Sequence, residues 1–138
     1  MIQTKHKDYL LYEIPSGWIV DEANDSVSIY DNDGKGALTL SFLTIIQLQD
    51  TLDEYISVMA KKFIDNNQIR IENSLILDGT KKNKLMLHGI GTTDDGWFIK
   101  LWVVAKYPRV VFATYQSERK TSELKKVDAI LESFQFTI

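Results

Sequence analysis

The chain has 138 residues, of which 44% are hydrophobic and 25% charged, and its formal net charge is -3. This length predicts a single domain over residues 1–138, with a core large enough to fold without disulfides. The small negative charge gives no electrostatic reason to expect a nucleic acid or an anionic membrane as partner. No cysteine is present, which excludes disulfides, thiol nucleophiles and thiolate metal ligands.

Neither a signal peptide nor a membrane helix is visible in the sequence. Residues 1–7 contain no apolar stretch of the kind that signal peptides carry. No run reaches the roughly 18 apolar residues that are needed to cross a bilayer. From the sequence we therefore expect a cytoplasmic protein without a membrane span.

Short β-type runs alternate with turns in the first part of the chain. These runs are residues 9–14, 18–20, 26–31 and 37–46. Each carries the alternation, or the β-branched and aromatic residues, that favour strands. Pro15 and Gly17 end the first run, because proline donates no backbone hydrogen bond and glycine accepts a positive φ. We therefore expect several strands joined by short turns before the first helix.

One of these turns resembles the start of a calcium-binding loop. Asp31, Asp33 and Gly36 match two ligand positions and the glycine of that loop. Lys35, however, places a cation at the fifth position, and Phe42 replaces the bidentate carboxylate at the twelfth. A hairpin turn rich in Asp, Asn and Gly is therefore the predicted structure, and no metal is expected.

A helix is predicted to begin after Thr51. The Thr51 hydroxyl can cap the helix, and Glu54 three residues later completes a capping box. Apolar residues then recur at helical spacing and form one stripe suited to docking on a sheet. They are Leu52, Tyr55, Ile56, Met59, Ala60, Phe63 and Ile64. Asn66 and Asn67 are predicted to end the helix.

The second half of the chain centres on a predicted hairpin, residues 97–117, which turns at residues 107–109. Both faces of its first run carry large apolar side chains, because side chains alternate along a strand. One face holds Trp97, Ile99, Leu101, Val103 and Ala105, and the other holds Phe98, Lys100, Trp102, Val104 and Lys106. Since both faces need cover, the hairpin belongs at the centre of a sheet with layers on each side. Residues 69–77 and 85–92 predict the strands before it, with a turn at 93–96.

A second helix is predicted after Thr121 or Ser122, either of which can cap it, with Glu123 in the first turn. Its apolar positions are Leu124, Val127, Ile130, Leu131 and Phe134. Residues 134–138 predict a last short strand. Because strands follow one another through short turns, the predicted fold class is α+β. It has a central, mainly antiparallel sheet with helices packed on one or both of its faces.

Few residues suggest catalysis or ligand binding. His6 lies in the charged N-terminal segment, where we expect it to be solvated, and His88 lies in a strand without a partner nearby in the sequence. No Gly-x-Ser-x-Gly marks a nucleophile, and two distant histidines without cysteine do not make a zinc site. Gly89 and Gly91 lack the setting of a phosphate loop and predict a bulge or a close backbone approach within a strand. We expect no catalytic residue, no metal and no cofactor.

Two lysine clusters have a structural explanation. Lys81, Lys82 and Lys84 form a basic run in a predicted loop, and Lys125 and Lys126 fall on the exposed face of the second helix. All five are predicted to be solvated.

Three short motifs stand out along the chain. Residues 13–18 read Glu-Ile-Pro-Ser-Gly-Trp, residues 51–55 read Thr-Leu-Asp-Glu-Tyr, and residues 130–134 read Ile-Leu-Glu-Ser-Phe after Thr-Tyr at 114–115. The first resembles the strand and Pro-x-Gly-Trp opening of the PsbP/Mog1-like proteins and their bacterial relatives of unknown function. The second resembles the start of their first helix, and the third their closing strand and helix. The order of elements agrees as well, so the resemblance covers nearly the whole chain.

The resemblance implies an α-β-α sandwich around a central antiparallel sheet. Members of this family include a photosystem-associated protein, a binder of a small GTPase, bacterial envelope lipoproteins and chaperone-like adaptors for secreted toxins, and most of them bind proteins. No functional residue carries over, because the matched positions look like scaffold. Trp18 is expected in the core, and Phe134 is expected to pack under the last helix.

The leading hypothesis is a non-enzymatic protein-binding module, such as an adaptor, a chaperone-like protein or an immunity-type protein. Its candidate anchors are Tyr30, Phe98, Trp102 and Tyr107, chosen because aromatic side chains dominate binding hot spots. The alternative for these four residues is burial under the helices.

Two other functions stay open. One is a binder of a small molecule or lipid, or an enzyme with a dispersed site around His88, which needs a pocket of roughly 300 Å³ with converging polar groups. The other is a structural role as an isologous homodimer, formed through a sheet edge or through the face that carries Trp102. The sequence is compatible with a monomer or a homodimer.

Overall fold

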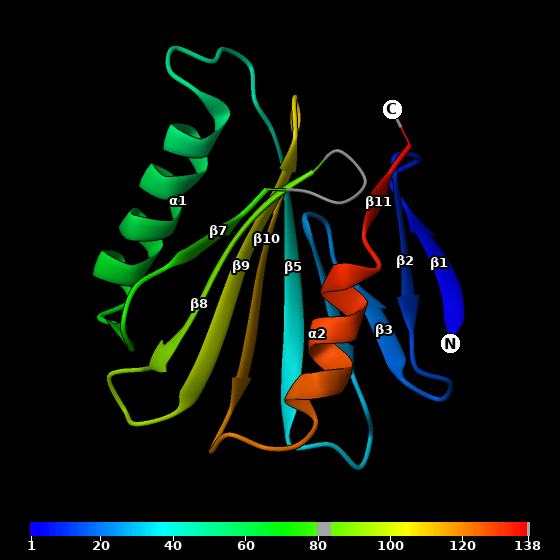
Figure 1. The fold of residues 1–138 in the computed structure, drawn as a ribbon. Coiled ribbons are helices and arrows are strands. Elements are labelled where there is room, and N and C mark those ends of the chain that lie inside the picture. The colour runs from blue at the N-terminus through cyan, green and yellow to red at the C-terminus, as the bar shows by residue number, and fades with distance from the viewer. Residues whose placement is uncertain (80–83, 138) are drawn as a thin grey trace.

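The computed structural model describes residues 1–79 and 84–137. Within those residues the chain forms strands and two helices, arranged in layers (Figure 1). The strands are β1 (Ile2–His6), β2 (Leu10–Ile14), β3 (Ile19–Glu22), β4 (Ser26–Tyr30), β5 (Gly36–Thr44), β6 (Arg70–Ile71), β7 (Ile76–Asp78), β8 (Leu85–Thr92), β9 (Phe98–Lys106), β10 (Arg109–Ser117) and β11 (Gln135–Phe136). The helices are α1 (Leu52–Asn66) and α2 (Leu124–Glu132).

One large antiparallel sheet has the strand order β3-β4-β5-β10-β9-β8-β6, and β7 also pairs with β8. β10 lies in the middle and pairs over its whole length with β5 on one side and β9 on the other. The hairpin predicted over residues 97–117 therefore forms and occupies the centre of the sheet, which confirms the predicted α+β fold class.

A second, smaller antiparallel sheet has the order β1-β2-β11. It joins the two ends of the chain, because the first two strands pair with the last one. The periodicity of residues 9–14 and 134–138 predicted strands there but did not separate them from the main sheet, and β1 was not predicted. Pairing between segments more than 120 residues apart leaves no local signal in the sequence.

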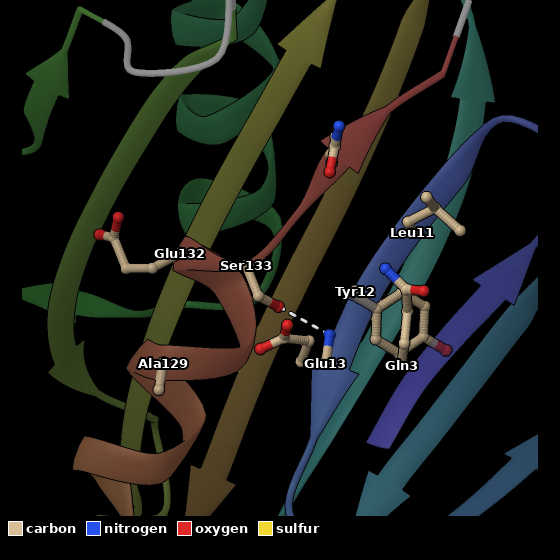
Figure 2. A pocket seen from close by; sticks show the side chains of 8 residues that line it. Gln3, Leu11, Tyr12, Glu13, Ala129, Glu132 and Ser133 are labelled. Carbon is tan, nitrogen blue, oxygen red and sulfur yellow. Dashed lines mark hydrogen bonds between the residues drawn. The ribbon is translucent and has the colours of Figure 1, made fainter. Parts of the chain in front are cut away.

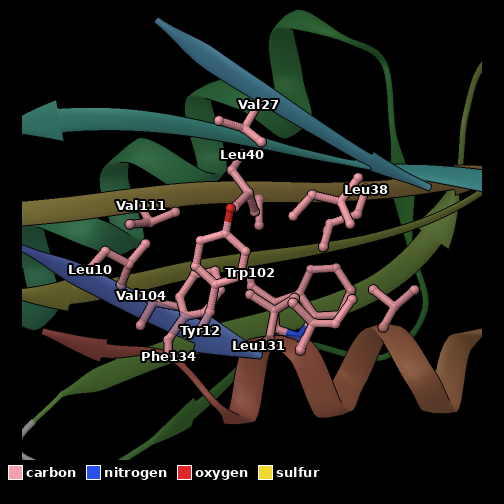
Figure 3. Packing of buried hydrophobic residues seen from close by; sticks show 14 of the residues in the cluster. Leu10, Tyr12, Val27, Leu38, Leu40, Trp102, Val104, Val111, Leu131 and Phe134 are labelled. Atoms are coloured by element: carbon pink, nitrogen blue, oxygen red, sulfur yellow. The ribbon is translucent and has the colours of Figure 1, made fainter. Parts of the chain in front are cut away.

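The two faces of the large sheet are covered by different elements. α2 and the small sheet lie over one face, where Tyr12, Trp102 and Phe134 pack among aliphatic side chains (Figure 3). α1 packs on the opposite face through a stripe that includes Ile56 and Ala60. The predicted layers on both sides of the central hairpin are therefore present.

The first helix begins as its capping box predicted, and the second does not. Thr51 is the N-cap of α1, and its hydroxyl accepts a hydrogen bond from the Glu54 backbone N–H over 3.3 Å. α2 begins only at Leu124, with Glu123 as its N-cap and no capping hydrogen bond from a side chain. Neither Thr121 nor Ser122 is therefore the cap, and Glu123 does not lie in the first turn. The Glu123 carboxylate instead accepts a 2.8 Å hydrogen bond from Tyr115 Oη, because the sheet brings that phenol next to it.

The strand predicted over residues 69–77 is divided into β6 and β7. Asn73 lies between them with a φ of 60°, a left-handed conformation that asparagine tolerates and that interrupts an extended strand. Both short strands pair with β8, and a Cβ added to Gly91 would collide with the backbone carbonyl oxygen of Arg70. The close backbone approach predicted at this glycine is therefore confirmed.

Two expectations about charged residues were wrong. The His6 ring stacks on Phe42 at 4.2 Å between centroids and contacts Glu22 at 3.2 Å, so it is held between the two sheets rather than solvated. Lys84 is 5% exposed, and its Nζ donates to backbone carbonyls at the end of α2. Lys81 and Lys82 lie outside the described residues.

Two further features of the sequence have simple structural outcomes. Asp31 accepts hydrogen bonds from the backbone N–H groups of Gly34 and Asp33, so a turn forms where the calcium-loop pattern lay. Lys125 and Lys126 are exposed on α2, as predicted. Neither helix of the described chain is long and apolar enough to cross a membrane.

Candidate protein-binding surface

α1 covers only part of the sheet face on which it lies. The apolar cluster beneath α1 draws its strand residues mainly from β8, β9 and β10, and β3, β4 and β5 contribute none of them. In Figure 1, α1 flanks the side of the sheet formed by β7, β8 and β9, away from β3. The other half of the same sheet face is therefore left without a helix.

The side chains on this uncovered half are mostly hydroxyls, and we call them together the open face. Antiparallel register places them on one side of three neighbouring strands, because paired residues share a face. They are Ser26, Ser28 and Tyr30 of β4, Ala37, Thr39 and Ser41 of β5, and Thr114 and Gln116 of β10. All are half-buried or exposed. Polar residues suit this face, because among the described residues no apolar layer packs on it.

A hollow of about 580 Å³ lies at one end of the open face. Tyr30, Thr39, Thr114 and Gln116 line its floor, and Trp97 and the turn between β4 and β5 contribute to its border. The hollow is broad and open to solvent, so it is a shallow depression on a sheet and not an enclosed cavity. This shape suits a segment of another molecule lying across the strands.

Trp97 is one of two large aromatic residues at this hollow, and Tyr30 is the other. Trp97 is 42% exposed, and its backbone N–H donates to Thr93 Oγ1 over 2.9 Å. Gly96 precedes it with a φ of 88°, which the turn between β8 and β9 requires. The backbone of Trp97 is therefore held in place while its indole remains available to a partner.

Tyr30 is anchored to the neighbouring strand through its phenol. Tyr30 Oη donates to Asp21 Oδ2 over 2.8 Å, and this hydrogen bond to a carboxylate raises the pKa of the phenol above its usual value. The contact fixes the orientation of the ring on the open face. It also places the Asp21 carboxylate beside the hollow.

The four aromatic residues selected from the sequence lie at different places. Tyr30 is on the open face. Trp102 is 2% exposed in the core under α2, so its indole is not available at the surface, and Phe98 packs half-buried against the same core. Tyr107 is 50% exposed in the turn at the far end of β9. The structure therefore does not gather these residues into one surface.

The sequence did not indicate that Trp97 is a surface residue, because the alternation along residues 97–105 places it on a strand face that was expected to be covered. It does share that face with Leu101 and Val103, but it lies at the strand end, beyond the reach of α1. The polar alternation of residues 26–30 and 37–41 was the signal in the sequence for an uncovered face.

A second hollow, of about 440 Å³, lies between β2 and the end of α2 (Figure 2). Its lining includes the polar side chains of Gln3, Glu13, Glu132 and Gln135. The backbone N–H of Glu13 donates to Ser133 Oγ over 2.8 Å, which joins the strand to the helix at this point.

His88 lies apart from both hollows. Its Nε2 is 2.9 Å from Asp78 Oδ2, and its side chain is 18% exposed while that of Asp78 is 58% exposed. Across the sheet its neighbours are Ile76 and Trp102. The contact between His88 and Asp78 joins β8 to β7. Among the described residues, no group of three or more His, Asp or Glu side chains is placed to hold a metal ion.

Comparisons with known proteins show the fold. No family model and no curated protein matches the chain. Among solved structures it is similar to a mutant of the protein Mog1, with a TM-score of 0.63 and 10% identity over 98% of this chain and 96% of that one. It is also similar to cyanobacterial PsbP (CyanoP) from Synechocystis sp. PCC 6803, with a TM-score of 0.65 and 15% identity over 96% and 89%.

A third similar structure is a protein from Bacteroides thetaiotaomicron, with a TM-score of 0.54 and 11% identity over 95% of this chain and 46% of that one. At these identities the likeness shows the fold and no more. The chain has the PsbP/Mog1-like fold, which confirms the resemblance found in its sequence.

Proposed function

We propose that this chain is a non-enzymatic protein-binding module that receives its partner on the open face. The observation that carries the proposal is the half-uncovered sheet, with a hollow of about 580 Å³ bordered by the exposed indole of Trp97. An exposed aromatic side chain beside a recessed polar surface has the composition of a binding hot spot. The PsbP/Mog1-like fold supports the same kind of role.

The chemistry of the open face suits recognition. Hydroxyl and amide side chains such as Thr39, Thr114 and Gln116 can both donate and accept hydrogen bonds with the polar groups of a partner. They stand on a sheet whose other face is fully packed, so their positions are rigid before a partner arrives. A rigid surface loses little conformational entropy on binding. In this proposal the module acts as an adaptor, a chaperone-like protein or an immunity-type protein.

The proposal can be tested by site-specific photocrosslinking in an extract of the source organism. Benzoylphenylalanine would be placed at Ala37 or Gln116, which are exposed on the open face, and at Lys61, which is exposed on α1, as the control. We expect the same discrete protein adduct from both open-face positions and none from Lys61. An excess of unlabelled wild-type protein should abolish the adduct.

A matched pair of aromatic variants sharpens the test. Trp97→Ala removes the exposed indole at the hollow, and Tyr107→Ala removes a similarly exposed ring at the other end of β9. Only Trp97→Ala should reduce the adduct. Equal crosslinking from the α1 control, or no adduct from either open-face position, contradicts the proposed function.

The hollow in Figure 2 favours a second candidate function, the binding of a small molecule. At about 440 Å³ it exceeds the size that the sequence-based alternative required, and its lining includes the amides of Gln3 and Gln135 and the carboxylates of Glu13 and Glu132. A small-molecule screen followed by NMR would test it. A true ligand should shift the side-chain amide signals of Gln3 and Gln135 and leave that of Gln116 unchanged.

A further inference from the structure

We infer that the outer side of α1 is a contact between two copies of this chain, packed antiparallel about a two-fold axis near Val58. Three features carry the inference: an apolar groove beside the helix, an almost fully exposed isoleucine next to that groove, and an order of charges along the helix that matches its own reversed copy. None of these residues lies on the open face, so the inference does not depend on the proposed function.

A groove of about 350 Å³ lies between α1 and the loop that precedes it. Its apolar lining comes from Tyr55, Val58 and Met59. Ile56 and Ala60 are buried on the other side of the helix, which packs on the sheet. Figure 1 shows α1 as an outer layer of the molecule, with the sheet on one side only. The groove therefore opens on a side of α1 that no other element of the described chain covers.

Two apolar residues at this groove remain in contact with solvent. Val58 is 52% exposed, and Ile46 is 96% exposed and directly precedes Gln47, which lines the groove. A contact about a two-fold axis uses the same patch on both copies. Each Ile46 can then enter the groove of the other copy while its own groove receives the same side chain. An apolar projection beside an apolar recess is therefore complementary to itself.

The charges along the helix indicate which way the second copy lies. Glu54, Val58 and Lys62 follow at four-residue intervals and form one exposed ridge. Glu54 and Lys62 are about 12 Å apart along the axis, too far to pair with each other, and neither forms an ion pair with another described residue. Reversing a second helix about Val58 places its Lys62 beside Glu54 and its Glu54 beside Lys62. Two ion pairs then flank the apolar centre, whereas a parallel copy would bring like charges together.

The order of the charges, and not their sum, selects a second copy. The groove is lined by two carboxylates, Asp50 and Glu54, and by one cation, Lys62. Antiparallel packing pairs Glu54 with Lys62 and leaves Asp50 at the end of the contact, where it is exposed. Lys61 is also exposed but does not line the groove, because the turn of the helix places it on the other side of Val58.

The extent of the contact sets the expected affinity. It spans about two turns of α1 and one loop, which is less than a permanent dimer interface needs. We therefore expect a reversible dimer with a dissociation constant of roughly 10–500 μM. Sedimentation velocity on the whole chain, from about 1 μM to about 1 mM, measures it. A sedimentation coefficient that stays at the monomer value over the whole range overturns the inference.

Charge-reversal variants test the antiparallel register. Glu54→Lys and Lys62→Glu each place like charges at both flanks and should weaken the dimer by about tenfold. The double variant, Glu54→Lys with Lys62→Glu, should recover the wild-type affinity. An equimolar mixture of the two single variants should also dimerise, because one chain then carries only cations at the flanks and the other only carboxylates. Lys125→Glu, the same change of charge on the exposed face of α2, is the control and should change nothing.

The apolar part of the contact has its own pair of variants. Ile46→Ser should weaken the dimer by about tenfold, whereas Ile76→Ser, at an exposed position on β7, should not. The inference is overturned if the mixed charge variants stay monomeric, or if either control weakens the dimer as much as its test variant does. Lys62→Glu should lose the dimer and keep the adduct formed from the open face, which separates this contact from the proposed function.

Discussion

Lys84 Nζ lies 2.7 Å from the backbone carbonyl oxygen of Phe134 and joins the chain just before β8 to the second residue after α2. The same ammonium donates to the Glu132 carbonyl over 3.1 Å. These carbonyls stand at the C-terminal end of the helix, where backbone acceptors lack helical partners and the helix dipole favours a cation. A buried lysine that would otherwise be costly therefore completes the end of α2.

Replacing this lysine should destabilise the fold. Lys84→Met keeps most of the side-chain volume but leaves the carbonyls of Glu132 and Phe134 without the ammonium, so we expect a loss of about 1–3 kcal/mol in the free energy of unfolding. Urea denaturation followed by circular dichroism measures it. Lys125→Met, on the exposed face of α2, is the control and should change stability by less than about 0.5 kcal/mol. Equal effects of the two variants would show that Lys84 does not hold the helix end.

Tyr12→Phe should leave stability unchanged or raise it. Tyr12 is 1% exposed, and among the described residues its hydroxyl has no hydrogen-bond partner. In Figure 3 the ring lies within the apolar cluster, near Leu40. Removing an unsatisfied buried hydroxyl is expected to add up to about 1 kcal/mol to the free energy of unfolding at pH 7. A loss of more than 1 kcal/mol in the same urea assay would show that the hydroxyl does have a partner in solution.

Stability should fall at alkaline pH because of the same residue. Burial, and secondarily the charge of Glu22, raises the pKa of Tyr12 to about 12, whereas the unfolded phenol titrates near 10. The folded state therefore binds the phenol proton of Tyr12 more tightly than the unfolded state does. The free energy of unfolding keeps its full value below about pH 10 and falls as the pH rises from 10 towards 12. Linkage gives a loss of about 2–3 kcal/mol across that window.

The pH dependence is measured by denaturation at a series of pH values between 9 and 12. Burial also raises the pKa of Tyr115, so part of the decline should persist without Tyr12. Tyr12→Phe should decline less steeply than the wild type, and Tyr107→Phe, at an exposed position, should follow the wild type. Parallel curves for Tyr12→Phe and the wild type would mean that Tyr12 does not carry the effect.

Gly91→Ala should loosen β6 from β8. A methyl group at this position would meet the carbonyl oxygen of Arg70 and the side chain of Ile69, both too close for an ordinary contact. We expect a loss of about 1–3 kcal/mol and faster amide exchange at Arg70 and Ile71. Gly79→Ala, where no atom of the described residues would lie within 4 Å of the added methyl group, is the matched control and should stay within about 0.5 kcal/mol of the wild type. Unchanged exchange in Gly91→Ala would refute the close approach.

Much of the fold could be predicted from local patterns. The capping box at Thr51 set the start of α1, and the alternation of residues 85–92 and 97–117 gave the central strands within a residue of their observed ends. Large apolar side chains on both faces of β9 required a layer on each side, and both layers are present. These features depend on residues close together in the chain, so the sequence carries them directly.

The candidate binding surface could be predicted only in part. Tyr30 was selected for its aromatic ring, and it lies on the open face, but Trp102 was selected by the same criterion and is buried. An aromatic residue in a strand serves a core and a binding surface equally well, because both use its large apolar area. Which role applies depends on whether another element covers it.

By itself the sequence of this protein determined most of the strands, the start of α1 and the need for two apolar layers, since periodicity and capping act over a few residues. Only the tertiary structure decided that α1 would cover β8 and β9 and leave β4 and β5 bare, that the two chain ends would form a sheet of their own, and that Lys84 would lie under the end of α2. The position of a helix over a sheet depends on many contacts between segments that are distant in the sequence. Local patterns within one segment therefore do not predict it.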